Sequence, residues 1–415
     1  MNNSLVLILA AVMALGSNLN AAGFRLSEQD AKAAGMGNAF TAVADNASAV
    51  WYNPAAITNL EGTNLSLGSV MVAPSMEHKN TDANGAAADK IKNKLHIPPH
   101  FYATHKMNDH WSLGLGVNAP FGLATEWNKT DATTRIVATK SEIEAIYTNM
   151  NGAYKLNDKL SFGLGLAWVN LDAEMNKKIE MLGNNVEQKL TGNGTGWGYN
   201  AAAFYKYTDK LQFGANFRSK VKVDVDGKIK LPTTGVLATL AADGDATTSI
   251  TLPDLFQLGA AYKYSDKWLF SAEADYTDWT TYRKLVIDYD TTAGVAKQSI
   301  DYKNWKSVWA FRAGTEYKYS DAWKFRGGAF YDLNPVKEKY FETRVPDSDR
   351  VGLSVGAGYT KGSITVDASY MYIMFLKRTV SGSVQDDALT GKTTVIDGKY
   401  TASAHLSAIT VSYKF

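Results

Sequence analysis

Cysteine is absent from this sequence of 415 residues. Its absence excludes disulfide bridges, thiolate metal ligands and a cysteine nucleophile, although an oxidising compartment remains open. An excess of one charge is also absent, because 43 lysine and arginine residues face 41 aspartate and glutamate residues. A balanced charge gives no electrostatic attraction for nucleic acid, so we expect no nucleic-acid partner.

Long apolar runs are missing as well. The run Leu5–Gly16 is too short to cross a bilayer as a helix, and no later segment offers the ~18 apolar residues that a spanning helix needs. A small-residue stretch ending Asn20-Ala21-Ala22 follows it, which is typical of a secretory signal peptide. We predict a signal peptide over residues 1–21. A buried N-terminal helix of a cytosolic protein stays open as the alternative, because Met1–Ser4 carries no lysine or arginine.

Aromatic residues and glycine are plentiful, with 22 Tyr, 10 Trp and 34 Gly against 9 Pro. From Thr63 onward, segments of roughly ten residues alternate apolar and polar side chains with period two. Within 211–218, for example, Leu, Phe, Ala and Phe alternate with Gln, Gly, Asn and Arg. Such segments have one face suited to lipid, and they predict an antiparallel transmembrane β-barrel.

The alternation predicts about fourteen strands, an even number as in bacterial outer-membrane barrels. They are expected near 63–75, 97–106, 111–121, 143–154, 160–173, 196–207, 211–223, 254–264, 268–279, 305–319, 323–331, 351–359, 363–375 and 403–415.

The connections and the last strand indicate the membrane. Short turns such as 207–209 and 265–266 alternate with long polar segments, as periplasmic turns alternate with external loops in outer-membrane barrels. The chain ends on Phe415 after an alternating strand, which resembles the signal read by the barrel assembly machinery. These features disfavour a soluble β-sandwich. We therefore predict a multi-pass barrel in a Gram-negative outer membrane, with its lipids and the assembly machinery as partners.

The segment before the first strand has another character. Residues 22–62 are rich in alanine and glycine and lack strand periodicity, yet they contain the apolar Val50-Trp51-Tyr52 and the stiff turn Asn53-Pro54. A barrel of this strand number encloses more space than its own side chains fill. We predict an N-terminal plug over 22–62 and the barrel over 63–415, in preference to a flexible periplasmic extension.

The order of several short motifs resembles the outer-membrane long-chain fatty acid transporters of the FadL type, a family that also includes aromatic-hydrocarbon channels. The resemblance covers nearly all of the predicted mature chain. The motifs are Ala22–Leu26, Asn53–Ala55, Gly122–Glu126, Gly152–Tyr154, Ser161–Gly165, Thr251–Pro253 and Val345–Asp347.

The resemblance implies a fourteen-stranded barrel closed by a plug, capture of ligand from outside, and lateral release through a kinked third strand that faces Asn53, Pro54 and Ala55. The sequence offers a physical basis for the kink at Pro120 and Gly122, because proline has no N–H to donate and glycine tolerates bends. The residues alone leave open that the third strand simply ends there.

The resemblance also places three ligand-binding residues. The carboxylate-binding cations of the family fall on Lys177, just beyond the fifth strand, and on Lys306, at the start of the tenth. Lysine in place of the family's arginine at position 177 leaves a point charge instead of a bidentate partner. The phenylalanine that lines the same pocket falls on Phe24.

Transport competes with two other classes of function. A general porin conflicts with a plugged lumen, and a lipid-acting barrel enzyme lacks a credible nucleophile and base. The match of Gly352–Gly356 to G-x-S-x-G lies inside an alternating strand, whereas a nucleophilic serine needs a strand-to-helix elbow. We expect a monomeric, non-enzymatic channel without cofactor, for a long-chain fatty acid or alternatively an aromatic hydrocarbon.

Overall fold

The computed structural model describes residues 23–80, 88–128, 132–181, 183–231, 243–290, 297–384 and 396–415. The predicted signal peptide and Ala22 lie outside these residues. Fourteen strands form a closed antiparallel barrel. They are β1 (Thr63–Asn80), β3 (Pro99–Lys106), β4 (Trp111–Glu126), β5 (Lys140–Lys155), β6 (Leu160–Met181), β7 (Asn184–Lys206), β8 (Leu211–Arg218), β11 (Asp254–Lys263), β12 (Trp268–Asp278), β15 (Val308–Lys318), β16 (Trp323–Asp332), β17 (Arg350–Lys361), β18 (Ile364–Phe375) and β20 (Gly398–Lys414).

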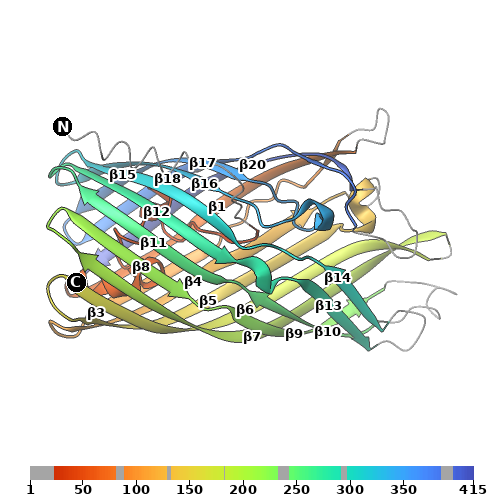
Figure 1. Cartoon of the computed structure of the whole chain (residues 1–415), viewed down its shortest axis with the longest axis horizontal. Coiled ribbons are helices and arrows are strands. Elements are labelled where there is room, and N and C mark those ends of the chain that lie inside the picture. The colour runs from red at the N-terminus through yellow and green to blue at the C-terminus, as the bar shows by residue number, and fades with distance from the viewer. Residues whose placement is uncertain are drawn as a thin grey trace.

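The barrel closes between its first and last strands. Strand β1 pairs with β20 on one side and with β3 on the other. Each of the fourteen predicted strands overlaps a strand of the barrel, but the one predicted over 211–223 ends at Arg218, and a separate strand β9 (Val221–Lys230) follows it. The predicted short turns join neighbouring strands at the end of the barrel where Phe415 lies, on the left of Figure 1.

Large apolar side chains point outward along the strands. Leu164 in β6, Trp197 in β7 and Leu353 in β17 are each more than half exposed, at 68%, 62% and 61%. Their sequence neighbours point inward, because successive side chains of a strand alternate between faces. An outer surface of this kind fits lipid. In the described part of the chain, no helix is both long and apolar enough to cross a membrane.

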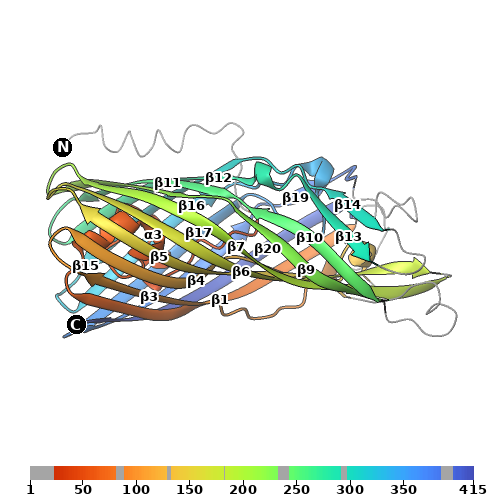
Figure 2. The same ribbon diagram turned by 90° about the horizontal axis from the view of Figure 1, so that it is seen from below.

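Further strands extend the barrel away from the short turns (Figures 1 and 2). They are β2 (Asp89–Lys90), β9 (Val221–Lys230), β10 (Gly244–Leu252), β13 (Lys284–Asp290), β14 (Gln298–Tyr302) and β19 (Arg378–Val380). Short helical turns occur at η2 (Thr133–Ile136), η3 (Trp279–Thr281) and η4 (Glu338–Tyr340). Pro253 separates β10 from β11, as expected of a residue without an N–H.

The hairpin of β6 and β7 differs from the prediction. The sequence predicted strand ends near 173 and 196 with a polar loop between, whereas β6 and β7 stay paired up to Met181 and Asn184. The change from apolar to polar outward residues therefore marks the end of the lipid-facing surface and not the end of the strands. Lys177 consequently lies within β6.

The N-terminal segment 23–62 lies inside the barrel. It contains α2 (Ala31–Gly35), α3 (Ala49–Tyr52) and η1 (Pro54–Asn59), and nearly all of its residues are buried. Its backbone reaches strands on several sides, since Gly35 approaches Gly356 of β17 and Ala55 approaches Gly163 of β6. A Cβ atom at Gly163 would lie 2.6 Å from the backbone nitrogen of Ala55, so glycine permits this close approach.

Candidate functional site

Strand β4 is irregular at the predicted kink. Its register with β5 shifts between Asn118 and Phe121, which leaves Ala119 and Pro120 without regular partners. Proline cannot donate to the ladder, and an extra residue in one strand bends it. Because β4 nevertheless continues to Glu126, the alternative that the strand ends here is wrong, and the irregularity lies where the kink was predicted.

The wall beside this bulge is completed by the N-terminal segment. The pairing of β3 with β4 ends at Val117. Beyond this point the Leu26 N–H donates to the Pro120 carbonyl over 2.8 Å, and the Gly122 N–H donates to the Phe24 carbonyl over 3.0 Å. Residues 24–26 therefore act as a short strand that fills the place of β3.

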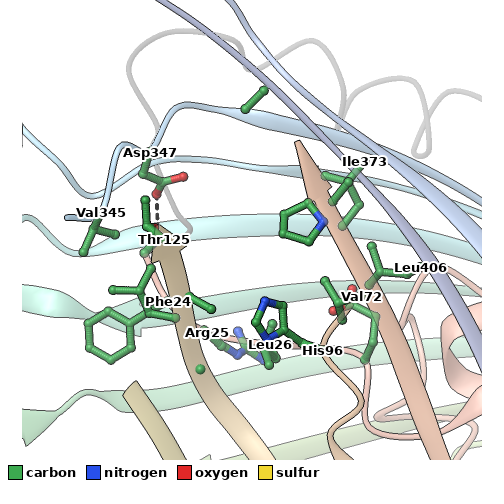
Figure 3. A pocket seen from close by; sticks show the side chains of 18 of the residues that line it. Phe24, Arg25, Leu26, Val72, His96, Thr125, Val345, Asp347, Ile373 and Leu406 are labelled. Atoms are coloured by element: carbon green, nitrogen blue, oxygen red, sulfur yellow. Dashed lines mark hydrogen bonds between the residues drawn. The ribbon is translucent and has the colours of Figure 1, made fainter. Parts of the chain in front are cut away.

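A cavity of about 410 Å³ adjoins residues 24–26. Figure 3 shows Phe24 on one side of it and the apolar, inward-facing Val72, Ile373 and Leu406 on the other. Its lining also includes Glu144, which is exposed and belongs to the outward face of β5. The cavity thus reaches from the barrel interior to the outer face of the wall.

Phe24 is held in a cluster of aromatic rings. Its ring centroid lies 4.7 Å from that of Trp279, 5.9 Å from that of Trp305 and 6.1 Å from that of Tyr282. The ring of Phe121 lies 6.1 Å away on the strand with the bulge. Inclined contacts of this kind are favourable between aromatic rings. Phe24 therefore ties the N-terminal segment both to the wall and to the aromatic cluster.

Asp347 binds the backbone of Gly23. Its carboxylate accepts a hydrogen bond of 2.7 Å from the Gly23 N–H, drawn as a dashed line in Figure 3. Asp347 belongs to the loop between β16 and β17, and burial raises its pKa to about 6. The loop thereby fixes the residue that precedes Phe24.

Buried ion pairs anchor the same segment further inside. The carboxylate of Asp275 lies 3.0 Å from Arg25 and 3.0 Å from Arg312. Glu273 accepts hydrogen bonds from the N–H groups of Phe40 and Thr41 over 2.8 and 2.7 Å. Asp275, Glu273 and Arg312 belong to the polar side chains of the predicted strands, to which the sequence analysis assigned no role. Their alternation with lipid-facing aromatic residues was the signal that could have placed these charged side chains in the barrel interior.

Asn53, Pro54 and Ala55 are found away from the bulge. The Asn53 amide donates to the Thr41 and Ala203 carbonyls over 2.9 and 3.1 Å, while Pro54 and Ala55 lie against Gly163. These contacts place the three residues beside β6 and β7. The residues that meet the bulge are instead Phe24–Leu26 and Gln29, whose amide donates to the Ala119 carbonyl over 3.3 Å.

The predicted ligand-binding residues are not all brought together. Phe24 lines the cavity, as does Gly122, but Lys177 and Lys306 do not. Lys177 lies within electrostatic range of Asp301 in β14. Lys306 lies between β14 and β15, where its backbone N–H donates to the Pro335 carbonyl over 3.2 Å.

Ser354 has a structural role. Its hydroxyl donates to the Gly35 carbonyl over 3.2 Å and accepts from the Gly37 N–H over 3.0 Å. It lies inside β17 and anchors the N-terminal segment, in keeping with the prediction that the G-x-S-x-G match is coincidental.

Comparison with known proteins identifies the family. Residues 12–415 match the family described as outer membrane protein transport protein (OMPP1/FadL/TodX). The long-chain fatty acid transport protein of Salmonella typhi is 30% identical over 87% of this chain and 90% of its own length. That of Escherichia coli O6:H1 is 29% identical over 89% of this chain and 91% of its own.

Solved structures share the fold. A Pseudomonas aeruginosa FadL homologue superposes with a TM-score of 0.82 at 19% identity, covering 95% of this chain and all of that chain. The toluene transporter TodX of P. putida gives a TM-score of 0.73 at 16% identity, covering 96% of this chain and 99% of that chain. Members of the family are transport channels and not enzymes. This chain therefore belongs to the OMPP1/FadL/TodX family and is an outer-membrane transporter of hydrophobic compounds.

Proposed function

We propose that this protein takes up long-chain fatty acids from outside the cell and releases them sideways through the wall beside the β4 bulge. The observation that carries the proposal is the replacement of β3 by residues 24–26 at Pro120. Two backbone hydrogen bonds join this short strand to β4, while the rings around Phe24 and the ion pair of Arg25 with Asp275 hold it to the rest of the wall. Its departure would open a passage without breaking the barrel ladder elsewhere.

The interior supports an apolar cargo. The inward face of the extended strands carries the buried side chains of Val223, Ile229, Ile250, Leu285 and Ile287. Burial of an acyl chain contributes on the order of 0.8 kcal/mol per methylene, so a surface of this kind supplies affinity for a long tail. The N-terminal segment, in the role of a plug, would block straight passage toward the short turns and direct the cargo to the wall.

Two arguments favour an acid over a neutral compound. The relatives from Escherichia coli and Salmonella typhi are named as long-chain fatty acid transport proteins. Lys177 and Lys306 remain our proposed cations for a carboxylate, and a carboxylate in an apolar interior needs such a partner. An aromatic hydrocarbon is the second candidate, favoured by the rings around Phe24 and by the fold of the toluene transporter.

A reversible disulfide tests lateral release. Arg25 and Phe121 form an isolated antiparallel bridge flanked by the two hydrogen bonds, so cysteines at both positions are close enough to cross-link. The chain has no other cysteine. We expect the oxidised R25C/F121C variant to lose fatty acid uptake and the reduced form to regain it. Equal uptake in both redox states would contradict release at this place.

A further inference from the structure

A buried ionic cluster lies away from the cavity at the wall. Lys303 follows β14, and its side chain is completely buried and paired with the carboxylate of Glu342. Arg344 lies 2.6 Å from the other oxygen of Glu342 and 3.1 Å from Asp301. Lys303 lies 3.7 Å from Asp301. Glu342 and Arg344 come from the loop between β16 and β17, so the cluster joins this loop to the barrel.

The cluster holds a carboxylate in the way that an acid ligand would require. Glu342 is 2% exposed and receives a lysine and an arginine on its two oxygens. Charge-assisted contacts of this kind are the strong ones in proteins, and a buried carboxylate without them is costly. Lys177, a cation proposed above for the ligand, acts electrostatically on Asp301 of the same cluster.

Aromatic residues connect the cluster to Phe24. Tyr282 lies within electrostatic range of Glu342, and its ring is 5.0 Å from Trp305 and 6.1 Å from Phe24. Trp279 and Trp305 are buried, and their indole N–H groups have no acceptor within the described residues. A chain of aromatic ring contacts therefore extends from Tyr282, beside the ionic cluster, to Phe24 in the short strand at the wall.

The loop that carries Glu342 also carries contacts at the wall. Val345 lines the cavity, and Asp347 accepts the hydrogen bond from Gly23. Glu342 of the ionic cluster and Asp347, which accepts the hydrogen bond from Gly23, are thus five positions apart in one loop. A shift at Glu342 would be transmitted along this short stretch to Asp347.

We propose that Glu342 is an internal carboxylate occupying the head-group position, and that the carboxylate of a long-chain acid replaces it on Lys303 and Arg344. This inference rests on the function proposed above and names Lys303 as its main determinant of head-group selectivity. Replacement of Glu342 frees its loop, and the hydrogen bond from Gly23 to Asp347 is then lost. Binding of an acid thereby releases the short strand at the bulge, whereas a neutral ester leaves Glu342 in place.

Titration of the purified, detergent-solubilised protein with oleate and with methyl oleate tests the proposal. For Glu342→Gln we expect oleate to bind severalfold more tightly, because the internal competitor is removed, while methyl oleate binding stays unchanged. For Lys303→Met we expect the preference for oleate over the ester to fall by about tenfold. Lys284→Met is the matched control, because Lys284 is an exposed lysine on β13, and its preference should equal that of the wild type.

The outcomes distinguish a wrong role for the ionic cluster from a wrong transport function. Heat-dependent mobility on gels establishes that each variant is folded, and Lys303→Met/Glu342→Gln removes both charges together should the single lysine variant fail to fold. The double variant should prefer the acid less than Glu342→Gln does, because only Arg344 remains to hold the carboxylate. A preference in it equal to that of Glu342→Gln, or unchanged oleate affinity in Glu342→Gln, overturns the assignment of this cluster. A wild-type protein that binds neither compound overturns the proposed function itself.

Discussion

The two halves of the barrel interior differ in chemistry. Toward the short turns, inward-facing positions carry charged residues such as Arg312, Glu316 and Arg326, which are buried and paired. In the extended half, inward-facing positions carry apolar residues such as Val223 and Ile250. The same alternation along the strands produces both surfaces, so the difference lies in which residues occupy the inward face.

The difference indicates which half of the barrel interior is permanently occupied. Buried charges require partners that are present permanently, and the N-terminal segment supplies several of them, including Lys32 at 3.3 Å from Glu316. The apolar surfaces of the extended half have no such requirement. The buried charges of that half, Lys303, Glu342 and Arg344, pair with one another and not with the N-terminal segment, so a ligand on the apolar surfaces is exchangeable. This contrast favours a fixed segment near the short turns and a movable ligand beyond it.

Removal of a central charge in the filled half should have the largest effect. Arg326 donates to Glu316 and to Asp367, each over 2.7 Å, and its side chain is 2% exposed. Because Arg326→Met leaves two buried carboxylates short of a partner, we expect a loss of about 3–5 kcal/mol in the free energy of unfolding. Urea unfolding in lipid vesicles, followed by tryptophan fluorescence, measures this loss.

A neighbouring lysine provides the control for Arg326. Lys324 contacts the same Glu316 over 2.9 Å, but its side chain is 37% exposed. Solvent screens such a pair, so Lys324→Met should cost at most about 1 kcal/mol. Equal losses for the two variants would mean that burial does not distinguish these pairs.

A smaller effect is expected where the N-terminal segment packs on barrel glycines. A Cβ atom at Gly163 would lie 2.6 Å from the Ala55 nitrogen and 2.8 Å from the Pro54 carbonyl carbon. Gly163→Val should therefore displace this part of the segment at a cost of roughly 1–3 kcal/mol. Planar bilayers should show a higher ion conductance, because the segment no longer fills the lumen tightly.

The neighbouring strand offers a matched control for Gly163. Gly152 in β5 has no atom within 4 Å of the position that its Cβ would take. Gly152→Val should leave the conductance at the wild-type level. An increase in both variants would point to the strands themselves and not to the N-terminal segment.

The fold was largely predictable from the sequence because lipid imposes a strict rule on one face of every strand. Leu164 and Trp197 follow this rule, because a regular row of large apolar side chains on the outer surface is unfavourable in water but suited to lipid. The rule ends where lipid ends, which is why the ends of β6 and β7 were misplaced. Beyond lipid, polar outward residues are compatible with either a strand or a loop.

The site was less predictable because its contacts join residues that are far apart in the chain. The proline at 120 revealed a bend through its own chemistry. No sequence pattern in residues 24–26 indicated that they would pair with this strand, because an isolated bridge leaves no alternation of side chains to detect. The partners of Lys303 and Asp347 likewise depend on how a long loop folds back over the barrel, which no spacing in the sequence encodes.

The smallest expected effect concerns pH and the hold of Asp347 on Gly23. Burial raises the pKa of this carboxyl to about 6, with Arg350, the Gly23 N–H and Arg378 opposing the rise and Asp332 adding to it. Departure of Gly23 removes a hydrogen bond that lowers the pKa, but if the carboxyl also becomes exposed, the larger effect of burial is lost and the pKa falls toward the ordinary value of about 3.9. The held state thus binds a proton more tightly than the released state. The extra stability of the held state is complete below the pKa of the exposed Asp347 carboxyl, and it is lost as the pH rises through about 6, the pKa of the buried carboxyl.

Acidification from pH 7 to pH 5 should accordingly favour the held state by about 1 kcal/mol and slow fatty acid uptake severalfold. Reconstituted vesicles containing a fatty-acid-sensitive dye measure the rate, and the pH dependence of the dye is calibrated without protein. Asp347→Asn keeps an acceptor for the Gly23 N–H but has no proton to gain in this range, so its uptake should be independent of pH. A wild-type rate that rises on acidification would contradict stabilisation of the held state by protonation of Asp347. An Asp347→Asn variant that retains the wild-type pH profile would exclude Asp347 as the group that links release to pH.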